Sequence, residues 1–143
     1  MQPLAPDEVP ILLSLMPPLQ RLALAHRAAC LAQGVPFHFR SGYRSTGYQQ
    51  ILYGHPELHP GTPAAKPGSS KHERAAAYDA DHGNDLQTVI FGAEAEKLGL
   101  VWGGRFQRHA DGSGGPDYPH CELPNSLLDL DAYLEIRAAG LLA

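Results

Sequence analysis

Ser70-Lys71-His72-Glu73-Arg74-Ala75-Ala76-Ala77-Tyr78-Asp79 sets an imidazole and a carboxylate seven positions apart, where an alanine-rich run begins. Residues 75–80 are predicted to form a strand, in which Ala75, Ala77 and Asp79 share one face because side chains alternate along a strand. The two small alanines on that face leave room for a metal ion and a substrate backbone. The stretch therefore predicts a strand that carries a polar site.

A second pair of an acid and a histidine, Asp117-Tyr118-Pro119-His120, lies farther along the chain. Two histidines and one aspartate form a three-ligand set that suits zinc and leaves a fourth position open for water. The remaining acid is then free to act as a base, so the two elements predict metal-assisted hydrolysis. The residues alone leave Asp81 as an alternative to Asp79, because it lies on the same strand face.

Length and composition indicate one soluble globular domain over residues 1–143. The chain is 43% hydrophobic and 18% charged, which excludes a disordered protein. A formal charge of −4 gives no basic surface for nucleic acid or for an anionic membrane. We therefore expect a monomer that binds no nucleic acid.

The N-terminal region lacks the features of a targeting or membrane segment. No basic stretch precedes the apolar run Ile11–Met16, and Pro17-Pro18 end it, so neither a signal peptide nor a membrane span is expected. Two cysteines, Cys30 and Cys121, are too few for a disulfide framework. Reduced thiols are expected, and a single bridge stays as the alternative.

Hydrophobic periodicity and turn signals predict a mixture of helices and strands. Helices are expected over 19–33, from Ser45 or Thr46 to about Gly54, over 85–98, and from Asn125 or Ser126 to about Ala139. Further strands are expected at 37–41, within 99–104 and at 118–123. The order of these elements lacks β-α-β alternation, which favours an α+β fold with a small antiparallel sheet that bears the site and is flanked by helices.

Four ordered blocks within about 35–123 resemble the LAS-type zinc metallopeptidases, which include D-alanyl-D-alanine carboxypeptidases and phage L-alanyl-D-glutamate endopeptidases. Ser70-x-His72-x-x-Ala75-x-Ala77-x-Asp79 is similar to the family signature Ser-x-His-x-x-Gly-x-Ala-x-Asp. The other blocks are Ser41-Gly42-Tyr43-Arg44-Ser45 with Gln49, Gly99-Leu100-Val101-Trp102-Gly103-Gly104-Arg105-Phe106, and Asp117-Tyr118-Pro119-His120. Four blocks in order are more specific than any one of them.

The resemblance implies a role for each matching residue. It implies three Zn²⁺ ligands, which are His72, Asp79 and His120. Asp117 is implied as the general base, and Arg44 as the group that steadies the substrate carbonyl or the oxyanion. Ser70 and Gln49 are implied on the substrate side, with Ser70 as a structural or substrate hydrogen bonder and not a nucleophile.

Ala75 departs from the family signature, which has glycine at this position. A methyl group is tolerated there if the backbone angle φ is negative, because only glycine adopts positive φ without a steric cost. The methyl group can also crowd the cleft. Any effect of the methyl group is expected on substrate fit more than on metal binding.

The resemblance also implies a substrate, the stem peptide of peptidoglycan. Family carboxypeptidases usually place a glutamate before the last histidine, whereas Asp117-x-x-His120 after Trp102-Gly103-Gly104 is more like the endopeptidases. The expectation is an endolysin-like L-alanyl-D-glutamate endopeptidase, made in the cytoplasm and acting on the cell wall after release at phage lysis. The alternatives are a D-alanyl-D-alanine carboxypeptidase and a non-catalytic zinc-binding interaction domain, against which intact Asp117 and Arg44 argue.

Three further features leave alternatives open. The oxygen-rich loop that starts at Asp111 is either a glycine-hinged flap or a calcium loop, although Pro116 and Gly115 fit a calcium loop poorly. His55 and His59 are spaced like the ligands of a zincin helix, but the neighbouring prolines disfavour a helix there. Trp102 is expected in the core, with a wall of the cleft as the alternative.

Overall fold

The computed structural model describes residues 2–61 and 63–127, and the predicted last helix lies mostly outside them. The described part contains four α-helices: α1 Glu8–Leu13, α2 Pro17–Ala32, α3 Thr46–Gly54 and α4 Asp85–Lys97. It contains four strands: β1 His38–Ser41, β2 Ala77–Asp81, β3 Val101–Trp102 and β4 His120–Glu122. Short 3₁₀ turns complete it: η1 Pro56–Leu58, η2 Lys71–Arg74, η3 Gly103–Arg105 and η4 Asn125–Leu127.

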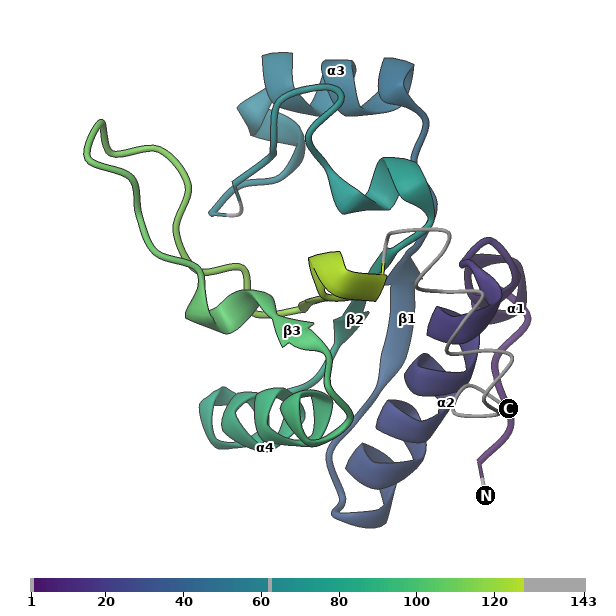
Figure 1. Cartoon of the computed structure of the whole chain (residues 1–143). Helices are drawn as coiled ribbons and strands as arrows, with labels where there is room; N and C mark the ends of the chain where they lie inside the picture. The colour runs from purple at the N-terminus through teal and green to yellow at the C-terminus, as the bar shows by residue number, and fades with distance from the viewer. Residues whose placement is uncertain (1, 62, 128–143) are drawn as a thin grey trace.

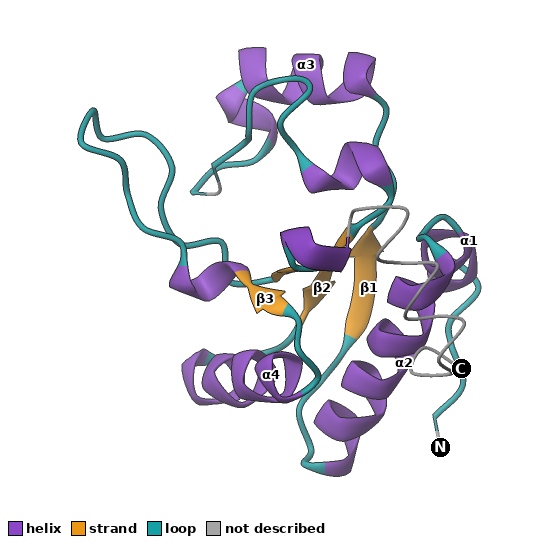
Figure 2. Cartoon of the chain, viewed as in Figure 1, coloured by secondary structure: helices purple, strands orange, loops and turns teal. Residues whose placement is uncertain are grey.

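The four strands form one sheet in the order β1-β2-β4-β3, and every neighbouring pair is antiparallel. Helix α2 runs beside β1, α4 lies beneath β3, and α3 stands apart at the other end of the molecule (Figure 1). Colouring by secondary structure shows the small sheet with helices placed around it (Figure 2). The expected α+β class with an antiparallel sheet is confirmed.

One face of the sheet packs against α2 and α4 to make the core. Strand β2 contributes Tyr78 and Ala80 to this core, and both side chains are fully buried. Asp79 lies between them in sequence, so strand alternation turns it to the opposite face. The core helices therefore cover one side of the sheet and leave the other side for the polar site.

His26 of α2 joins three elements inside the core and is fully buried. Its Nε2 lies 2.8 Å from the Phe91 carbonyl oxygen of α4, and its Nδ1 lies 2.7 Å from the Tyr78 hydroxyl of β2. A carbonyl only accepts, so Nε2 carries the proton and Nδ1 accepts from Tyr78. Burial lowers the pKa of His26 to about 4, so the ring is neutral at pH 7.

The observed elements follow their sequence signals closely. Helix α2 starts two residues before the predicted 19–33 because Pro17 and Pro18 occupy its first turn, where a missing N–H costs nothing. Ser45 caps α3 as predicted, and its hydroxyl accepts from the Tyr48 amide at 3.1 Å. Asn84 caps α4 through a reciprocal bond with Gln87. Local caps thus set these boundaries.

The condition under which a methyl group would be tolerated at Ala75, a negative φ, is not met. Its φ is +58° and its ψ is +26°, which is the left-handed conformation. It is the one non-glycine residue in the described part of the chain with positive φ. Ala75 ends η2 there, so β2 begins only at Ala77 and not at residue 75 as predicted. The left-handed backbone explains why the family has glycine at this position. For an alanine, this conformation costs roughly 1–2 kcal/mol.

Candidate metal centre

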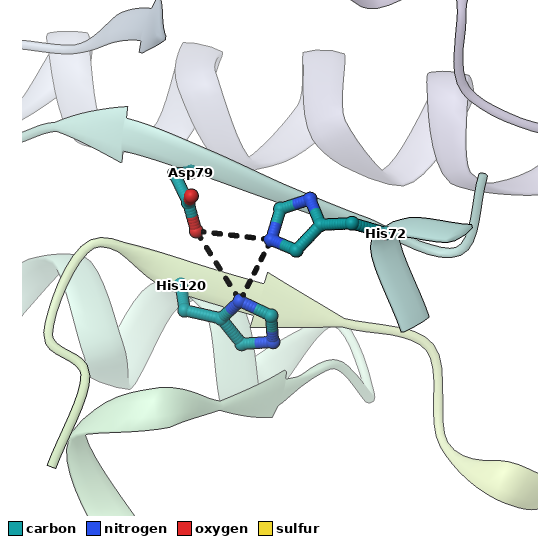
Figure 3. Close-up of side chains that lie close together, drawn as sticks. All are labelled: His72, Asp79 and His120. Atoms are coloured by element: carbon teal, nitrogen blue, oxygen red, sulfur yellow. Dashed lines mark hydrogen bonds and ion pairs between the residues drawn. The ribbon is translucent and has the colours of Figure 1, made fainter. Parts of the chain in front are cut away.

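His72, Asp79 and His120 come together from three different elements (Figure 3). His72 belongs to η2, Asp79 to β2 and His120 to β4, where Asp79 and His120 are direct partners across the sheet. His72 Nε2 lies 3.4 Å from Asp79 Oδ1, and His120 Nδ1 lies 3.2 Å from the same oxygen. The two ring nitrogens are 3.2 Å apart. The three residues thus form a compact triangle of potential ligand atoms.

In each histidine, a hydrogen bond from one ring nitrogen determines which nitrogen is left for the metal. His72 Nδ1 donates to the Gly42 carbonyl oxygen at 2.8 Å, which leaves Nε2 for a ligand. His120 Nε2 lies 2.7 Å from Glu122 Oε1 and donates to it, which leaves Nδ1. Such partners orient metal-binding histidines and set their tautomers. The two imidazoles are therefore held in the orientation that metal binding requires.

The spacing of the three atoms fits a tetrahedral zinc ion. Zinc bonds to nitrogen and oxygen of about 2.0–2.2 Å place neighbouring tetrahedral ligands roughly 3.3–3.6 Å apart. The three separations between His72, Asp79 and His120 are 3.2–3.4 Å. Burial lowers the pKa of His120, but hydrogen bonds with Asp79 and Glu122 outweigh it and raise the pKa to about 9. The centre thus attracts a cation, either a proton or a metal ion.

Asp79 is held as a carboxylate by groups on both of its oxygens. Oδ2 accepts from the Ser41 hydroxyl at 2.7 Å and from Arg44 at 3.3 Å, while Oδ1 faces the two histidines. Burial raises the pKa of Asp79, yet hydrogen bonds from His120 and His72 together lower it well below the usual range. One oxygen is therefore available to a metal ion, in its charged form.

Arg44 is hydrogen-bonded to the Asp79 oxygen that does not face the histidines, and to two further side chains. Its guanidinium contacts Asp79 Oδ2, the Ser41 hydroxyl at 3.3 Å and Gln49 Oε1 at 3.0 Å. Gln49 is fully buried, and its amide nitrogen donates to the Ala65 carbonyl oxygen at 2.7 Å. In this conformation Gln49 anchors the arginine and the 55–70 loop. The roles implied for Arg44 and Gln49 toward a substrate stay predictions.

Ser70 is the N-cap of η2 and is buried. Its hydroxyl accepts from the His72 amide at 3.2 Å, and Glu73 bonds back to the Ser70 amide. This capping box fixes the turn that carries His72. The cap gives Ser70 a structural role, which is one of the two roles expected for it; the role toward a substrate stays a prediction.

Asp117 lies beside the triangle, with Oδ2 3.9 Å from His120 Nδ1. Its other oxygen, Oδ1, is buried and has no hydrogen-bond partner in the described part of the chain. Its amide donates to the Gly103 carbonyl oxygen at 2.8 Å, and a Cβ at Gly103 would lie 2.3 Å from the backbone carbonyl oxygen of Asp117. Burial and the neighbouring Asp79 charge raise the pKa of Asp117. This is a carboxylate suited to accept a proton.

Two residues of the centre escaped the sequence analysis, namely Glu122 and Lys71. Glu122 accepts from His120 and forms an ion pair with Lys71 through its other oxygen. The Lys71 ammonium also donates to the Leu123 carbonyl oxygen at 2.8 Å. Strand alternation from His120 could have identified Glu122, because residues two apart share a face. No local signal indicates Lys71, because its contacts cross between distant segments.

The structure bears on the alternatives that the sequence left open. Asp81 is exposed and pairs with Arg40 at 2.9 Å, whereas Asp79 lies with the two histidines and is the ligand candidate. Trp102 packs on the core, as expected. Asp111 accepts from the amide and hydroxyl of Ser113, and both the flap and the calcium loop stay predictions. His55 pairs with Glu57 at 2.9 Å, and the segment between His55 and His59 is the 3₁₀ turn η1, not the α-helix that a zincin ligand pair requires.

Both cysteines, Cys30 and Cys121, are buried free thiols, as expected. Within the described residues, the triad of His72, Asp79 and His120 is the one cluster found that could hold a metal ion. No helix among those residues is both long enough and apolar enough to cross a membrane.

Comparison with known proteins identifies the fold. No family model and no curated protein matches the chain. Among solved structures, the LdcB LD-carboxypeptidase superposes with a TM-score of 0.61 at 16% identity, over 88% of this chain and 64% of that chain. The Serratia marcescens L-Ala D-Glu endopeptidase ChiX gives a TM-score of 0.57 at 16% identity, covering 83% and 87%. The D,D-pentapeptidase VanY in complex with Zn(II) gives 0.53 at 20%, covering 87% and 76%.

The resemblance to LAS-type zinc peptidases is thus confirmed at the level of the fold. The chain has the same architecture as enzymes that cut different bonds, and it spans 64% of the length of the LdcB chain. Fold alone does not assign an activity, which has to be argued from the site.

Proposed function

We propose that this chain is a zinc-dependent peptidase that cuts the stem peptide of peptidoglycan, at the L-alanyl-D-glutamate bond. The observation that carries the proposal is the triangle of His72 Nε2, Asp79 Oδ1 and His120 Nδ1, with separations of 3.2–3.4 Å and a buried, unpartnered Asp117 oxygen beside it. Three ligands leave a fourth tetrahedral position open, which is the arrangement of catalytic zinc sites.

The residues divide the work of hydrolysis among them. A zinc ion held by the triad supplies Lewis acidity toward a peptide carbonyl and makes water a stronger acid. Asp117 accepts the proton of the attacking water and returns it to the leaving amine, a role that its raised pKa favours. Arg44 donates to Asp79 Oδ2 at 3.3 Å, and its positive charge is expected to offset charge that develops on the carbonyl oxygen.

The choice of bond rests on the acid that precedes the last histidine. An aspartate at residue 117 has a shorter side chain than the glutamate usual in the carboxypeptidases, and in this the element resembles that of the endopeptidases. The runner-up is a D-alanyl-D-alanine carboxypeptidase, because VanYB in complex with D-Alanine-D-Alanine shares the fold at a TM-score of 0.54. We further propose that the protein acts as a monomer on the cell wall, after release at phage lysis.

Mass spectrometry of products from defined peptidoglycan tests the proposal. The zinc-loaded protein is expected to release a D-glutamate-initiated peptide, a chelator to abolish the release, and added zinc to restore it. Loss of a single terminal D-alanine would instead identify the carboxypeptidase. Asp117→Asn is expected to bind zinc with near-normal affinity and to lose at least 100-fold in kcat. Zinc binding without cleavage by the wild-type chain would support a non-catalytic domain and overturn the proposal.

A further inference from the structure

One peptide unit connects helix α1 to the ligand candidate His72. The unit is the amide that joins Gly42 to Tyr43, directly after β1. Its carbonyl oxygen accepts the His72 Nδ1 proton at 2.8 Å, and its N–H donates to the hydroxyl of Ser14, the C-cap of α1, at 3.0 Å. Because a peptide unit is planar and rigid, a group that holds its N–H also fixes the direction of its carbonyl. Ser14 and His72 therefore hold opposite sides of the same rigid amide.

The hydrogen bonds of this chain all run in one direction. His72 Nδ1 donates to the Gly42 carbonyl oxygen, and the N–H of the same amide donates to Ser14 Oγ. The Ser14 hydroxyl in turn donates to the Ile11 carbonyl oxygen of α1 at 2.6 Å. Hydrogen bonds that follow one another in this way polarise each other. The Ser14 end of the chain thus makes the Gly42 carbonyl a stronger acceptor for the His72 ring.

His72 has more need of such support than His120 does. His120 donates its second ring proton to the Glu122 carboxylate at 2.7 Å, and a bond to a charged acceptor is strong. His72 donates to a neutral backbone carbonyl instead. The acceptor behind a metal-binding histidine fixes the ring and raises the basicity of the ligand nitrogen. Polarisation from Ser14 therefore strengthens the weaker of the two histidine supports.

Gly42 has no side chain at the point where the Ser14 hydroxyl approaches it. A Cβ on Gly42 would lie 2.6 Å from Ser14 Oγ and 2.9 Å from the Ile11 carbonyl oxygen, both too close for a carbon atom. Gly42 is not among the described glycines with positive φ, so the close approach of α1, and not the backbone angle, accounts for a glycine here. The end of α1 is thus packed tightly against the amide that supports His72.

The turn between α1 and α2 keeps Ser14 in place. Leu15 is buried in the core, and the Met16 amide donates to the Ala75 carbonyl oxygen at 2.9 Å. Ala75 ends η2, the turn that carries His72. Helix α1 lies beside β1 (Figure 1). The turn therefore contacts both segments on which the position of His72 depends, the end of η2 and the amide after β1.

We infer that Ser14 is a positioning residue of the metal centre, which acts on His72 through the Gly42–Tyr43 amide. The inference rests on the zinc site of the proposed function and adds to it a residue from outside the four sequence blocks. Ser14 works through another residue, so its contribution lies in the orientation and basicity of the His72 ring. Its loss is therefore expected to weaken zinc binding without removing a ligand.

Zinc affinity and NMR of the His72 ring test the inference together. Ser14→Ala removes the acceptor of the Tyr43 N–H, and it is expected to raise the zinc dissociation constant roughly 2- to 10-fold, the range of one neutral hydrogen bond. In the zinc-loaded protein, the His72 Nδ1 proton signal is expected to move upfield because its hydrogen bond weakens, while the His120 Nε2 proton keeps its shift. Ser14→Thr keeps the hydroxyl and is expected to retain both wild-type values.

Thr88→Val is the matched control, because the Thr88 hydroxyl also donates to a helix carbonyl, that of Asn84 at 2.9 Å, but on α4. It is expected to keep the wild-type zinc affinity and His72 signal. The inference would be overturned, with the proposed function intact, by unchanged zinc affinity in Ser14→Ala or by weaker affinity without a shift of the His72 proton. A Ser14→Thr protein that behaves like Ser14→Ala would also overturn it. A wild type that binds no zinc would overturn the proposed function and the inference together.

Discussion

Lys71 and Glu122 form an ion pair that joins the two segments carrying the histidine ligands. Lys71 directly precedes His72 on η2, and Glu122 lies two residues after His120 on β4. The ion pair therefore links η2 to β4 beside the metal centre. The side chains are only 17% and 13% exposed. Glu122 also accepts the His120 Nε2 proton at 2.7 Å. One carboxylate thus sets the tautomer of a ligand and ties the two segments together.

Truncation of this carboxylate is expected to weaken zinc binding. Glu122→Ala should raise the zinc dissociation constant roughly 10- to 100-fold, because His120 loses the partner that keeps Nδ1 toward the metal. Glu122→Gln should have a zinc dissociation constant between those of the wild type and Glu122→Ala. Its amide oxygen still accepts from His120, but the neutral side chain no longer forms an ion pair with Lys71. Competition with a chromogenic chelator measures the affinities, and nitrogen NMR of His120 reports its tautomer.

Glu96→Gln is the matched control, because Glu96 also pairs with a basic side chain but lies outside the centre. Its zinc affinity should equal that of the wild type. A folded Glu122→Ala protein with unchanged zinc affinity would show that the orientation of His120 is set by other contacts.

Ala75→Gly is expected to stabilise the protein. The left-handed backbone at φ +58° costs an alanine roughly 1–2 kcal/mol, and the glycine loses part of this gain because its unfolded chain is more flexible. A net gain of about 0.5–1 kcal/mol should appear as a higher urea midpoint with an unchanged slope.

Ala77→Gly provides the contrast, because Ala77 is fully buried in β2 and has no positive φ. It should lower the unfolding free energy by roughly 1 kcal/mol. If Ala75→Gly lowers the midpoint as well, the strain assigned to Ala75 does not exist.

His26 is expected to make the protein sensitive to mild acid. Burial lowers its pKa from 6.5 to about 4, so between these values the unfolded chain binds a proton that the folded chain does not. Its contribution to stability is complete above about pH 6.5 and is lost as the pH falls toward 4. The loss amounts to about 3 kcal/mol, at about 1.4 kcal/mol per unit of pKa difference.

His26→Gln removes this titration and keeps a donor for the Phe91 carbonyl oxygen. Its unfolding free energy, followed by urea titration at several pH values, should depend less on pH between 6.5 and 4 than that of the wild type. Parallel pH curves for the two proteins would mean that His26 is protonated in the folded state.

The parts of the centre that follow from local rules were predictable from the sequence. The ligand set could be predicted because His72, Asp79 and His120 sit in ordered motifs, and the structure brings these three side chains together. The start of α3 could be placed because Ser45 and Thr46 are both residues that can cap a helix. Contacts between distant segments had no such signal, which is why Lys71 was missed.

The backbone conformation of Ala75 could not be predicted from the sequence either. An alanine residue gives no indication that its φ is positive, since the preference belongs to the glycine that it replaces. At Ala75 the turn is fixed by a tertiary bond from the Met16 amide to its carbonyl oxygen at 2.9 Å, and by a local bond from its own amide to the His72 carbonyl oxygen at 3.2 Å. Packing overrode the residue's own preference, so the start of β2 was predicted two residues early.

Zinc is expected to stabilise the wild-type chain and to need Asp79 to do so. At a free zinc concentration about 100 times the dissociation constant, binding adds about 2.7 kcal/mol to the unfolding free energy, which raises the melting temperature measured by calorimetry. Asp79→Asn should abolish this rise, because it removes the one charged ligand among three. Asp81→Asn, two residues away on the same strand face but paired with Arg40, should retain it. A rise that survives Asp79→Asn and disappears with Asp81→Asn would move the metal centre to the other aspartate.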